Sequence, residues 1–318
     1  MVAFASTNMR TSDDDERRAP ALDSPYPLQE QDVDFFRENG HVLLRGVAAA
    51  EELAVLGPVI EAVALAQNRE TRPLEERDAY GRAFLQMINL WLSDRRVQAF
   101  VFARRFARIA AELLGVKSVR LYHDQALFKE PLGGYTPWHQ DQYYWPLDTN
   151  DTITLWMPLL PVPPEIGGMR FASGSHLLGH LGDHAIGDRS QEVFAKLIEE
   201  RGLPVDSVGA LDLGDATFHH GWTLHSARAN PTATLRPVMT IIYFKDGVRV
   251  SSLNHPARQM DRAMYLPECA EGERAAGEFC PKLHPRAAGA LPTPPERSKA
   301  YWQRVLGVLR ETRSESPR

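Results

Sequence analysis

The chain has 318 residues, 43% of them hydrophobic and 24% charged, and a formal net charge of −5 at pH 7. This composition excludes a chain that is disordered throughout, and the slightly acidic balance argues against nucleic acid as the main partner. The apolar runs are too short or too interrupted for a membrane span, no secretory signal is visible, and two cysteines do not make a disulfide scaffold. We therefore expect a soluble cytoplasmic protein.

The first part of the chain predicts mainly helices. In chain order we expect a flexible tail over 1–24, a helix over 28–38, a strand over 41–45, a helix near 49–66 and a helix over 95–114. Gly40 and Gly115 follow two of these helices and suit left-handed C-terminal caps. Arg104, Arg105 and Arg108 are assigned to the solvated face of the helix over 95–114.

After residue 116 the chain changes to short β-rich runs separated by Gly, Pro, Asp and Asn. We expect strands at 118–122, 125–129, 152–157, 169–172, 209–213, 216–219, 223–227 and 235–244, and helices at 190–201 and 296–310. Many short strands with turn signals between them predict a sandwich or barrel. The expected architecture is therefore a single, mainly β domain over 25–310 with flanking helices, a β-core at about 117–246, and a polar C-terminal tail at 311–318.

The densest cluster of reactive side chains is the run Trp138-His139-Gln140-Asp141. On a strand, residues two apart point to the same side, so His139 and Asp141 could offer a nitrogen and an oxygen to one metal ion. Two histidines and one carboxylate form the facial triad of non-haem Fe(II) oxygenases. The triplet alone is weak evidence, because a chain with 11 histidines is expected to contain one by chance. A surface His and Asp flanking a turn is the alternative.

A third ligand must come from further along the chain. The histidines after the triplet are His176, His180, His184, His219, His220, His225, His255 and His284. Only His225 is followed by an arginine eleven positions later, Arg236. The turn over 229–231 lies between them, so we expect His225 and Arg236 on adjacent strands of a hairpin, facing one cavity. His219 and His220 are interpreted as satisfied core histidines, and the alternative is that they line the substrate pocket, since their run approaches His225.

Taken together, these motifs resemble the phytanoyl-CoA dioxygenase family of Fe(II)/2-oxoglutarate-dependent oxygenases. The matching stretches are His139-Gln140-Asp141 with the aromatic run 143–146, Gly167-Gly168-Met169-Arg170 leading to 173–176, Gly214-Asp215, and His225 with Asn230 and Arg236. The similarity extends over roughly 28–246. It implies a double-stranded β-helix, the jelly roll that cupins also use.

The resemblance also implies a role for each matching residue. His139, Asp141 and His225 match the iron ligands, and Arg236 matches the residue that binds the distal carboxylate of 2-oxoglutarate. Weaker matches to the cosubstrate pocket are Gln140, Trp156 and Gln125. Ala227 stands where some relatives have a hydroxyl that helps to hold the same carboxylate, so Arg236 would have one helper fewer. Related halogenating enzymes lack the carboxylate ligand, so the presence of Asp141 favours hydroxylation or a related oxidation.

The implied activity is hydroxylation of a C–H bond in a small organic metabolite, with Fe(II), 2-oxoglutarate and O₂, yielding succinate and CO₂. One alternative is a cupin-type metalloenzyme without 2-oxoglutarate, against which Arg236 argues. The other is a non-catalytic jelly-roll binding protein, against which the intact triad argues. The absence of a strong basic patch favours a free metabolite over a CoA thioester. The aromatic residues around the ligands either wall the substrate pocket or pack the core; they are Trp138, Tyr143, Tyr144 and Trp222.

Overall fold

The computed structural model describes residues 22–287, 289 and 291–314. The helices are α2 (Glu30–Asn39), α3 (Ala50–Gln67), α4 (Ala79–Ala83), α5 (Arg95–Val101), α6 (Arg104–Leu114), α7 (Asp188–Arg201), α8 (Pro256–Tyr265) and α9 (Lys299–Ser314). The strands are β1 (His41–Leu44), β2 (Leu85–Ile88), β3 (Val119–Phe128), β4 (Thr136–His139), β5 (Thr152–Pro158), β6 (Met169–Ala172), β7 (Val205–Ser207), β8 (Ala216–His220), β9 (His225–Ala227), β10 (Val238–Lys245) and β11 (Lys282–His284).

The strands form two antiparallel sheets. The larger has the order β1-β8-β5-β10-β3-β11, with β2 also paired to β3, and the smaller has the order β4-β9-β6-β7. Strands β3 to β10 contribute four members to each sheet, and the chain passes repeatedly from one sheet to the other. This is the topology of a double-stranded β-helix, so the prediction of a mainly β jelly roll with flanking helices is confirmed.

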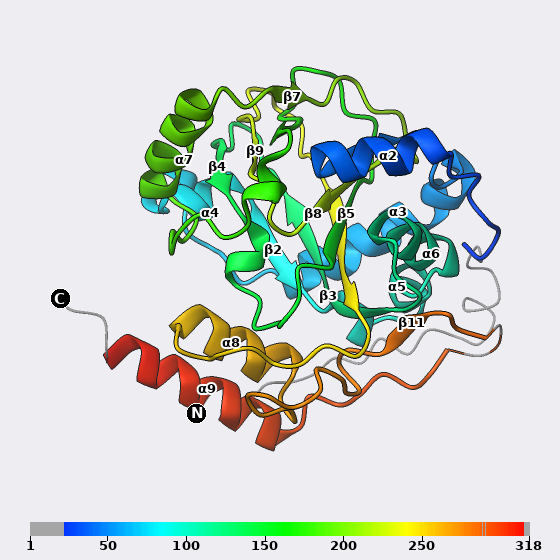
Figure 1. Cartoon of the computed structure of the whole chain (residues 1–318), viewed down its shortest axis with the longest axis vertical. Coiled ribbons are helices and arrows are strands. Elements are labelled where there is room, and N and C mark those ends of the chain that lie inside the picture. Colours follow the sequence, from blue (N-terminus) through cyan, green and yellow to red (C-terminus); the bar gives the residue numbers. More distant parts are fainter. Residues whose placement is uncertain (1–21, 288, 290, 315–318) are drawn as a thin grey trace.

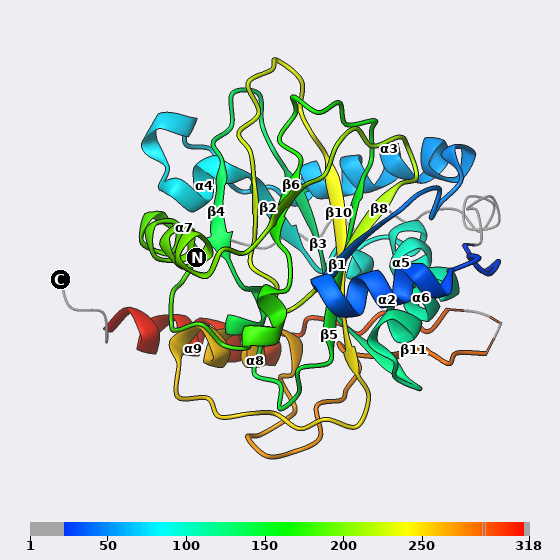
Figure 2. The same cartoon turned by 45° about the horizontal axis from the view of Figure 1, so that its top comes forward.

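Helices α5 and α6 cover the outer face of the larger sheet on one side of the molecule, and α7 lies beside β4 of the smaller sheet on the other (Figures 1 and 2). Helix α6 buries Phe106, Ile109 and Leu113 against this sheet in one continuous core. Each such side chain contributes roughly 1.5–3 kcal/mol on burial. The helices thereby fix the sheet in place and leave its other face free for a site.

The alternation of side chains along β5 decides which residues reach that inner face. Ile153, Leu155 and Met157 belong to the core shared with the helices. Thr154 and Trp156, at the intervening positions, line the internal pocket. Because successive side chains of a strand point to opposite faces, the hydrophobic positions of the strand determine the pocket positions between them.

The helix predicted over 95–114 is two helices, α5 and α6, with Phe102 and Ala103 between them. Phe102 is buried and donates its backbone N–H to Gln98 and Phe100 at the end of α5. The assignment of Arg105 to a solvated face is wrong, because its guanidinium is buried and binds the Glu52 carboxylate of α3 at 2.7 Å. The predicted strands at 118–122 and 125–129 are the single strand β3. The strand predicted at 209–213 is reduced to one bridge, between Leu211 and Val162.

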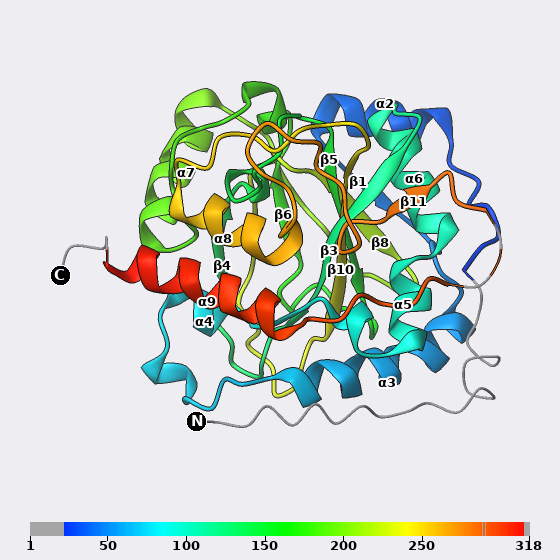
Figure 3. The same cartoon turned by 90° about the horizontal axis from the view of Figure 1, so that it is seen from below.

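The predicted helices at 28–38, near 49–66, at 190–201 and at 296–310 are confirmed as α2, α3, α7 and α9. Strand β2 and helix α8 were not expected. Helix α9 runs to Ser314, so it enters the segment predicted as a polar tail, and it lies beside α8 (Figure 3). Residues 1–21 and 315–318 of the predicted tails lie outside the described residues. Among the helices described, none is long and apolar enough to cross a membrane.

Candidate active site

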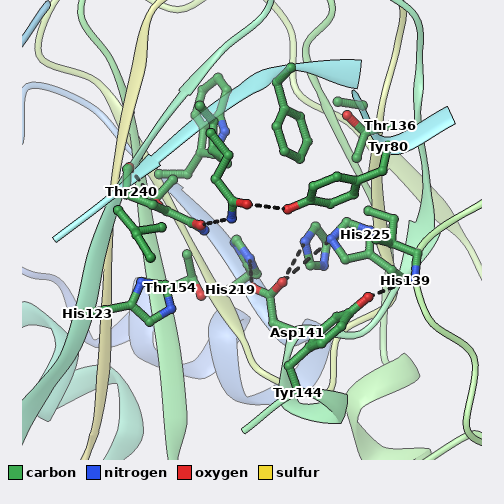
Figure 4. Close-up of a pocket in the computed structure, with 18 of the residues that line it drawn as sticks. Tyr80, His123, Thr136, His139, Asp141, Tyr144, Thr154, His219, His225 and Thr240 are labelled. Carbon is green, nitrogen blue, oxygen red and sulfur yellow. Dashed lines mark hydrogen bonds and ion pairs between the residues drawn. The ribbon is translucent and has the colours of Figure 1, made fainter. Parts of the chain in front are cut away.

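A cavity of about 490 Å³ lies between the two sheets (Figure 4). The larger sheet contributes Gln125, Trp156 and Thr240 to its lining, and the smaller sheet contributes His139 and His225. Side chains from both sheets therefore converge on one cavity, which is the usual setting of a small-molecule site.

Two histidines and an aspartate meet at one point of this cavity. His139 ends β4 and is paired directly with His225, the first residue of β9. Asp141 Oδ1 lies 3.5 Å from His139 Nε2 and 3.6 Å from His225 Nε2. The three potential ligand atoms all lie within 4.8 Å of one another. Figure 4 shows these side chains pointing at one another, with Tyr80 and Tyr144 on either side of them.

Asp141 reaches this point by a route that the sequence did not predict. Strand β4 ends at His139, and Asp141 begins a short 3₁₀ turn, Asp141–Tyr143. The expectation that both residues lie on one strand is wrong. The turn is held by a hydrogen bond from the Gln142 backbone N–H to the Gly221 carbonyl, so it brings the carboxylate back towards the two imidazoles.

Neighbouring groups orient all three candidate ligands. His139 Nδ1 lies 2.8 Å from the Pro137 carbonyl, and His225 Nδ1 lies 3.0 Å from the Thr223 carbonyl. A proton on each Nδ1 makes these hydrogen bonds and leaves each Nε2 with a free lone pair, as metal-binding histidines require. Asp141 Oδ2 accepts a hydrogen bond from Thr154 Oγ1 at 3.0 Å and lies 3.3 Å from His219 Nε2. Asp141 Oδ1 therefore remains for an ion.

The electrostatics keep the ligands in their metal-binding forms. Burial by itself raises the pKa of Asp141, but His225, His139 and His219 around it lower this pKa well below its ordinary value. Burial, and then the neighbouring His139, lower the pKa of His225 well below its ordinary value. An ionised carboxylate beside a neutral imidazole is the state that binds a cation. Two imidazoles and one carboxylate on one face suit Fe(II) and leave other positions open.

A buried cation with no acidic partner among the described residues lies in the same cavity. Arg236 is 4% exposed, and its guanidinium lies over the Trp156 ring at 5.2 Å. Its Nη1 donates to the Gly167 carbonyl, and its Nε has no hydrogen-bond partner within the described part of the chain. Burial lowers the pKa of Arg236 to about 9, so it remains a cation at neutral pH. A buried cation is costly unless it is paired, so this end of the cavity is built for an anion.

The structure corrects the predicted hairpin of His225 and Arg236. His225 lies on β9 of the smaller sheet, whereas Arg236 precedes β10 of the larger sheet and forms a backbone bridge with Lys129. The two residues therefore face the cavity from opposite sheets. Both line it, as expected.

The weaker site predictions divide in two. Trp156 and Gln125 line the cavity, and Gln125 accepts a hydrogen bond from Gln86, which accepts one from Tyr80. Gln140 does not line the cavity. Its amide nitrogen donates to the Gly179 and Trp222 carbonyls, and its amide oxygen accepts from the Leu181 N–H. Gln140 follows β4 directly with an extended backbone (φ −117°, ψ 125°), so its side chain points opposite to that of His139.

Sequence reasoning missed or misjudged several lining residues. His219 was interpreted as a core histidine, yet it lines the cavity beside Asp141. Thr154 carries no sequence signal beyond its position on β5. Of the four aromatic residues considered for a pocket wall, only Tyr144 lines the cavity. Trp138 packs instead against α7 in a separate core cluster.

With this geometry established, comparison with known proteins identifies the class. The family model for phytanoyl-CoA dioxygenase (PhyH) matches residues 36–238, more than half of the chain, and the protein belongs to this family. A probable alpha-ketoglutarate-dependent hypophosphite dioxygenase of Stutzerimonas stutzeri is 26% identical over 220 residues, covering 65% of this chain and 76% of the relative. The 1-deoxypentalenic acid 11-beta-hydroxylase of Streptomyces exfoliatus is 27% identical over 241 residues, covering 67% and 78%.

Solved structures give the same result. The epimerase SnoN, in complex with Fe³⁺, alpha ketoglutarate and nogalamycin RO, aligns with a TM-score of 0.65 at 26% identity, covering 80% of this chain and 98% of that one. The carbocyclase SnoK from nogalamycin biosynthesis aligns with a TM-score of 0.67 at 24% identity, covering 81% and 99%. The second likeness is evidence of the shared fold alone.

Proposed function

We propose that the protein is a 2-oxoglutarate-dependent non-haem iron dioxygenase that hydroxylates a C–H bond of a small organic molecule. The observation that carries this proposal is a single cavity that holds both a His–Asp–His triad and a buried guanidinium with no carboxylate partner among the described residues. The first suits Fe(II) and the second suits the carboxylate of a dicarboxylic cosubstrate. The relatives named above support both assignments. The same proposal includes a cytoplasmic location and a free metabolite as substrate.

In this proposal each group of residues has a separate role. His139, Asp141 and His225 hold the iron on one face, and Thr154 and His219 keep the Asp141 carboxylate aimed at it. When bound, the iron with 2-oxoglutarate and O₂ supplies the oxidising equivalents for the reaction, and the cosubstrate leaves as succinate and CO₂. The protein's part is to orient the ligands, exclude water and position the substrate.

Arg236 anchors the distal carboxylate of 2-oxoglutarate. Trp156 holds the guanidinium from its ring face, and Gly167 holds one of its nitrogens, so Arg236 is fixed before the cosubstrate arrives. The hydroxyl that some relatives carry at position 227 has a substitute, since Thr136 lies directly opposite Ala227 in the sheet and lines the cavity. A cupin-type enzyme without 2-oxoglutarate has no use for this buried cation, which is why we favour the oxoglutarate reaction.

The test is an anaerobic titration of the Fe(II)-loaded protein with 2-oxoglutarate, followed by the visible metal-to-ligand charge-transfer band. We expect the band in the wild type, its loss in His139→Ala, and its retention in the matched control His284→Ala on β11. With O₂ and a substrate panel, His139→Ala and Asp141→Ala should release no succinate. A folded wild type with Fe(II) bound and no band would refute the oxoglutarate assignment.

A further inference from the structure

Besides the triad and Arg236, the cavity has a second group of lining residues with a different character, here called its second end. Its walls there are largely aromatic and apolar, formed by Tyr80, Phe84, Tyr144, Trp145, Met264 and Tyr265. Arg236 is the only Lys or Arg among the described residues that line the cavity, and the cosubstrate occupies it in the proposed function. The acidic side chains left over are Asp78 and Asp261.

The two acidic side chains are not equivalent. Asp78 is exposed, and its carboxylate caps α4 by accepting from the Gly81 N–H at 2.7 Å. Asp261, on α8, is half-buried and lines the cavity. Its Oδ2 accepts from Tyr122 Oη at 3.0 Å, and no partner in the described part of the chain is recorded for its Oδ1. Burial raises the pKa of Asp261 to about 8, so at neutral pH this carboxyl is mainly protonated, and a cation placed beside it would favour its ionised form.

The aromatic surroundings of Asp261 suit a cation as well. Tyr265, one turn further along α8, stacks on His123 with ring centroids 4.3 Å apart. Burial, and then Tyr144, Asp141 and Asp261, raise the pKa of Tyr80 well above its ordinary value. Its hydroxyl therefore stays protonated and donates to Gln86. Aromatic ring faces attract cations, and one free carboxylate oxygen supplies the opposite charge.

We propose that Asp261 binds a protonated amine of the substrate, whose apolar body packs against the aromatic wall of the cavity. This proposal rests on the proposed function, since it takes Arg236 and the triad as occupied by the cosubstrate and iron. The proposed substrate differs in charge from hypophosphite and from 1-deoxypentalenic acid, which appear in the names of two relatives. An anionic substrate would find no free Lys or Arg among the described residues that line this end of the cavity. Helix α8 lies beyond the residues 36–238 that the family model matches, so Asp261 belongs to a part of the chain outside that match.

The test compares three probes that carry different polar groups on one phenethyl group, namely phenethylamine, phenethyl alcohol and hydrocinnamate. Each is titrated calorimetrically into the protein loaded with Fe(II) and 2-oxoglutarate under nitrogen. We expect the amine to bind at least about tenfold more tightly than the alcohol and the acid to bind most weakly. Asp261→Asn, which keeps the shape and the Tyr122 hydrogen bond, should abolish the preference for the amine and leave the affinity for the alcohol within about twofold.

Three outcomes would overturn the proposal. They are tighter binding of the acid than of the amine, an amine preference that persists in Asp261→Asn, and no amine binding up to its solubility limit. If Asp78→Asn abolished the amine preference instead, Asp78 and not Asp261 would be the amine-binding carboxylate, and the proposal would fall as well. The charge-transfer band with 2-oxoglutarate, recorded on the same samples, reports separately on the proposed function. If that band is absent, the amine titration of the metal-free protein still decides the role of Asp261.

Discussion

Replacing Arg236 by methionine tests whether the guanidinium serves cosubstrate binding or the stability of the fold. The guanidinium is buried, donates to Gly167 and lies over Trp156, but pairs with no carboxylate in the described chain. Removing one partner of a buried charge pair costs about 2–4 kcal/mol of binding free energy. The dissociation constant of 2-oxoglutarate should therefore rise about 30- to 900-fold. The melting temperature of the cosubstrate-free protein should be unchanged or higher, because a desolvated charge has been replaced by an apolar chain of similar length.

The assay is the anaerobic 2-oxoglutarate titration, together with thermal unfolding of the apoprotein. Arg236→Lys keeps the charge but loses the two-pronged geometry, so its affinity should lie between those of the wild type and Arg236→Met. Arg170→Met is the matched control, because Arg170 also lies over an indole ring, that of Trp138, but outside the cavity. An affinity in Arg236→Met within about threefold of wild type, or a clear fall in its melting temperature, would refute the reasoning.

Three further predictions follow from single contacts. His219→Ala removes the imidazole 3.3 Å from Asp141 Oδ2 and should weaken Fe(II) binding about 10- to 100-fold, measured by competition with a chelator, with little change in overall stability. Gly167→Ala should lower the unfolding free energy by at least about 1–2 kcal/mol and weaken 2-oxoglutarate binding. The reason is that Gly167 has φ +51°, and a Cβ there would lie 2.7 Å from the Arg228 carbonyl oxygen and 3.2 Å from Arg236 Nη1. An alanine variant with wild-type stability and wild-type 2-oxoglutarate affinity would contradict this prediction. Burial, and then Arg236, lower the pKa of Lys129 from 10.5 to about 6. Between these two pH values the unfolded chain therefore holds a proton on Lys129 that the folded chain lacks. The unfolding free energy should then rise with pH by up to about 1.4 kcal/mol per pH unit. Lys129→Met should flatten this slope in denaturant titrations across the same range, and an unchanged slope would count against the assignment.

The identity of the candidate ligands could be predicted from the sequence, but their geometry could not. The spacing of His139 and Asp141, and the numbers of residues from them to His225 and Arg236, can be read directly from the sequence. Asp141 nevertheless reaches the triad through a turn, held by a hydrogen bond to Gly221, a residue far along the chain. His225 and Arg236 belong to opposite sheets, which a local turn signal cannot distinguish from one hairpin. Long-range strand pairing decided both points.

Burial accounts for the other misjudged residues. Arg105 has the same sequence context as a solvated arginine, and only the tertiary structure brings it within 2.7 Å of Glu52 on α3. Gln140 lies between two candidate ligands, yet its amide completes a buried loop at Gly179 and Trp222. Whether a polar side chain serves the site or satisfies backbone groups depends on which groups are left unpaired nearby, and this follows from the tertiary structure.

The two ends of the cavity come from different parts of the chain, and this has a consequence for specificity. The triad and Arg236 lie on strands of the β-helix or directly next to them, and the alternation of these strands is fixed by the core on the other face. The other end draws Tyr80 and Gln86 from before that core and Asp261 and Tyr265 from after it. Substitutions in α4, β2 or α8 can therefore alter which molecule is held without moving the triad, since the rigid strands carry the chemistry and the flanking segments carry the recognition.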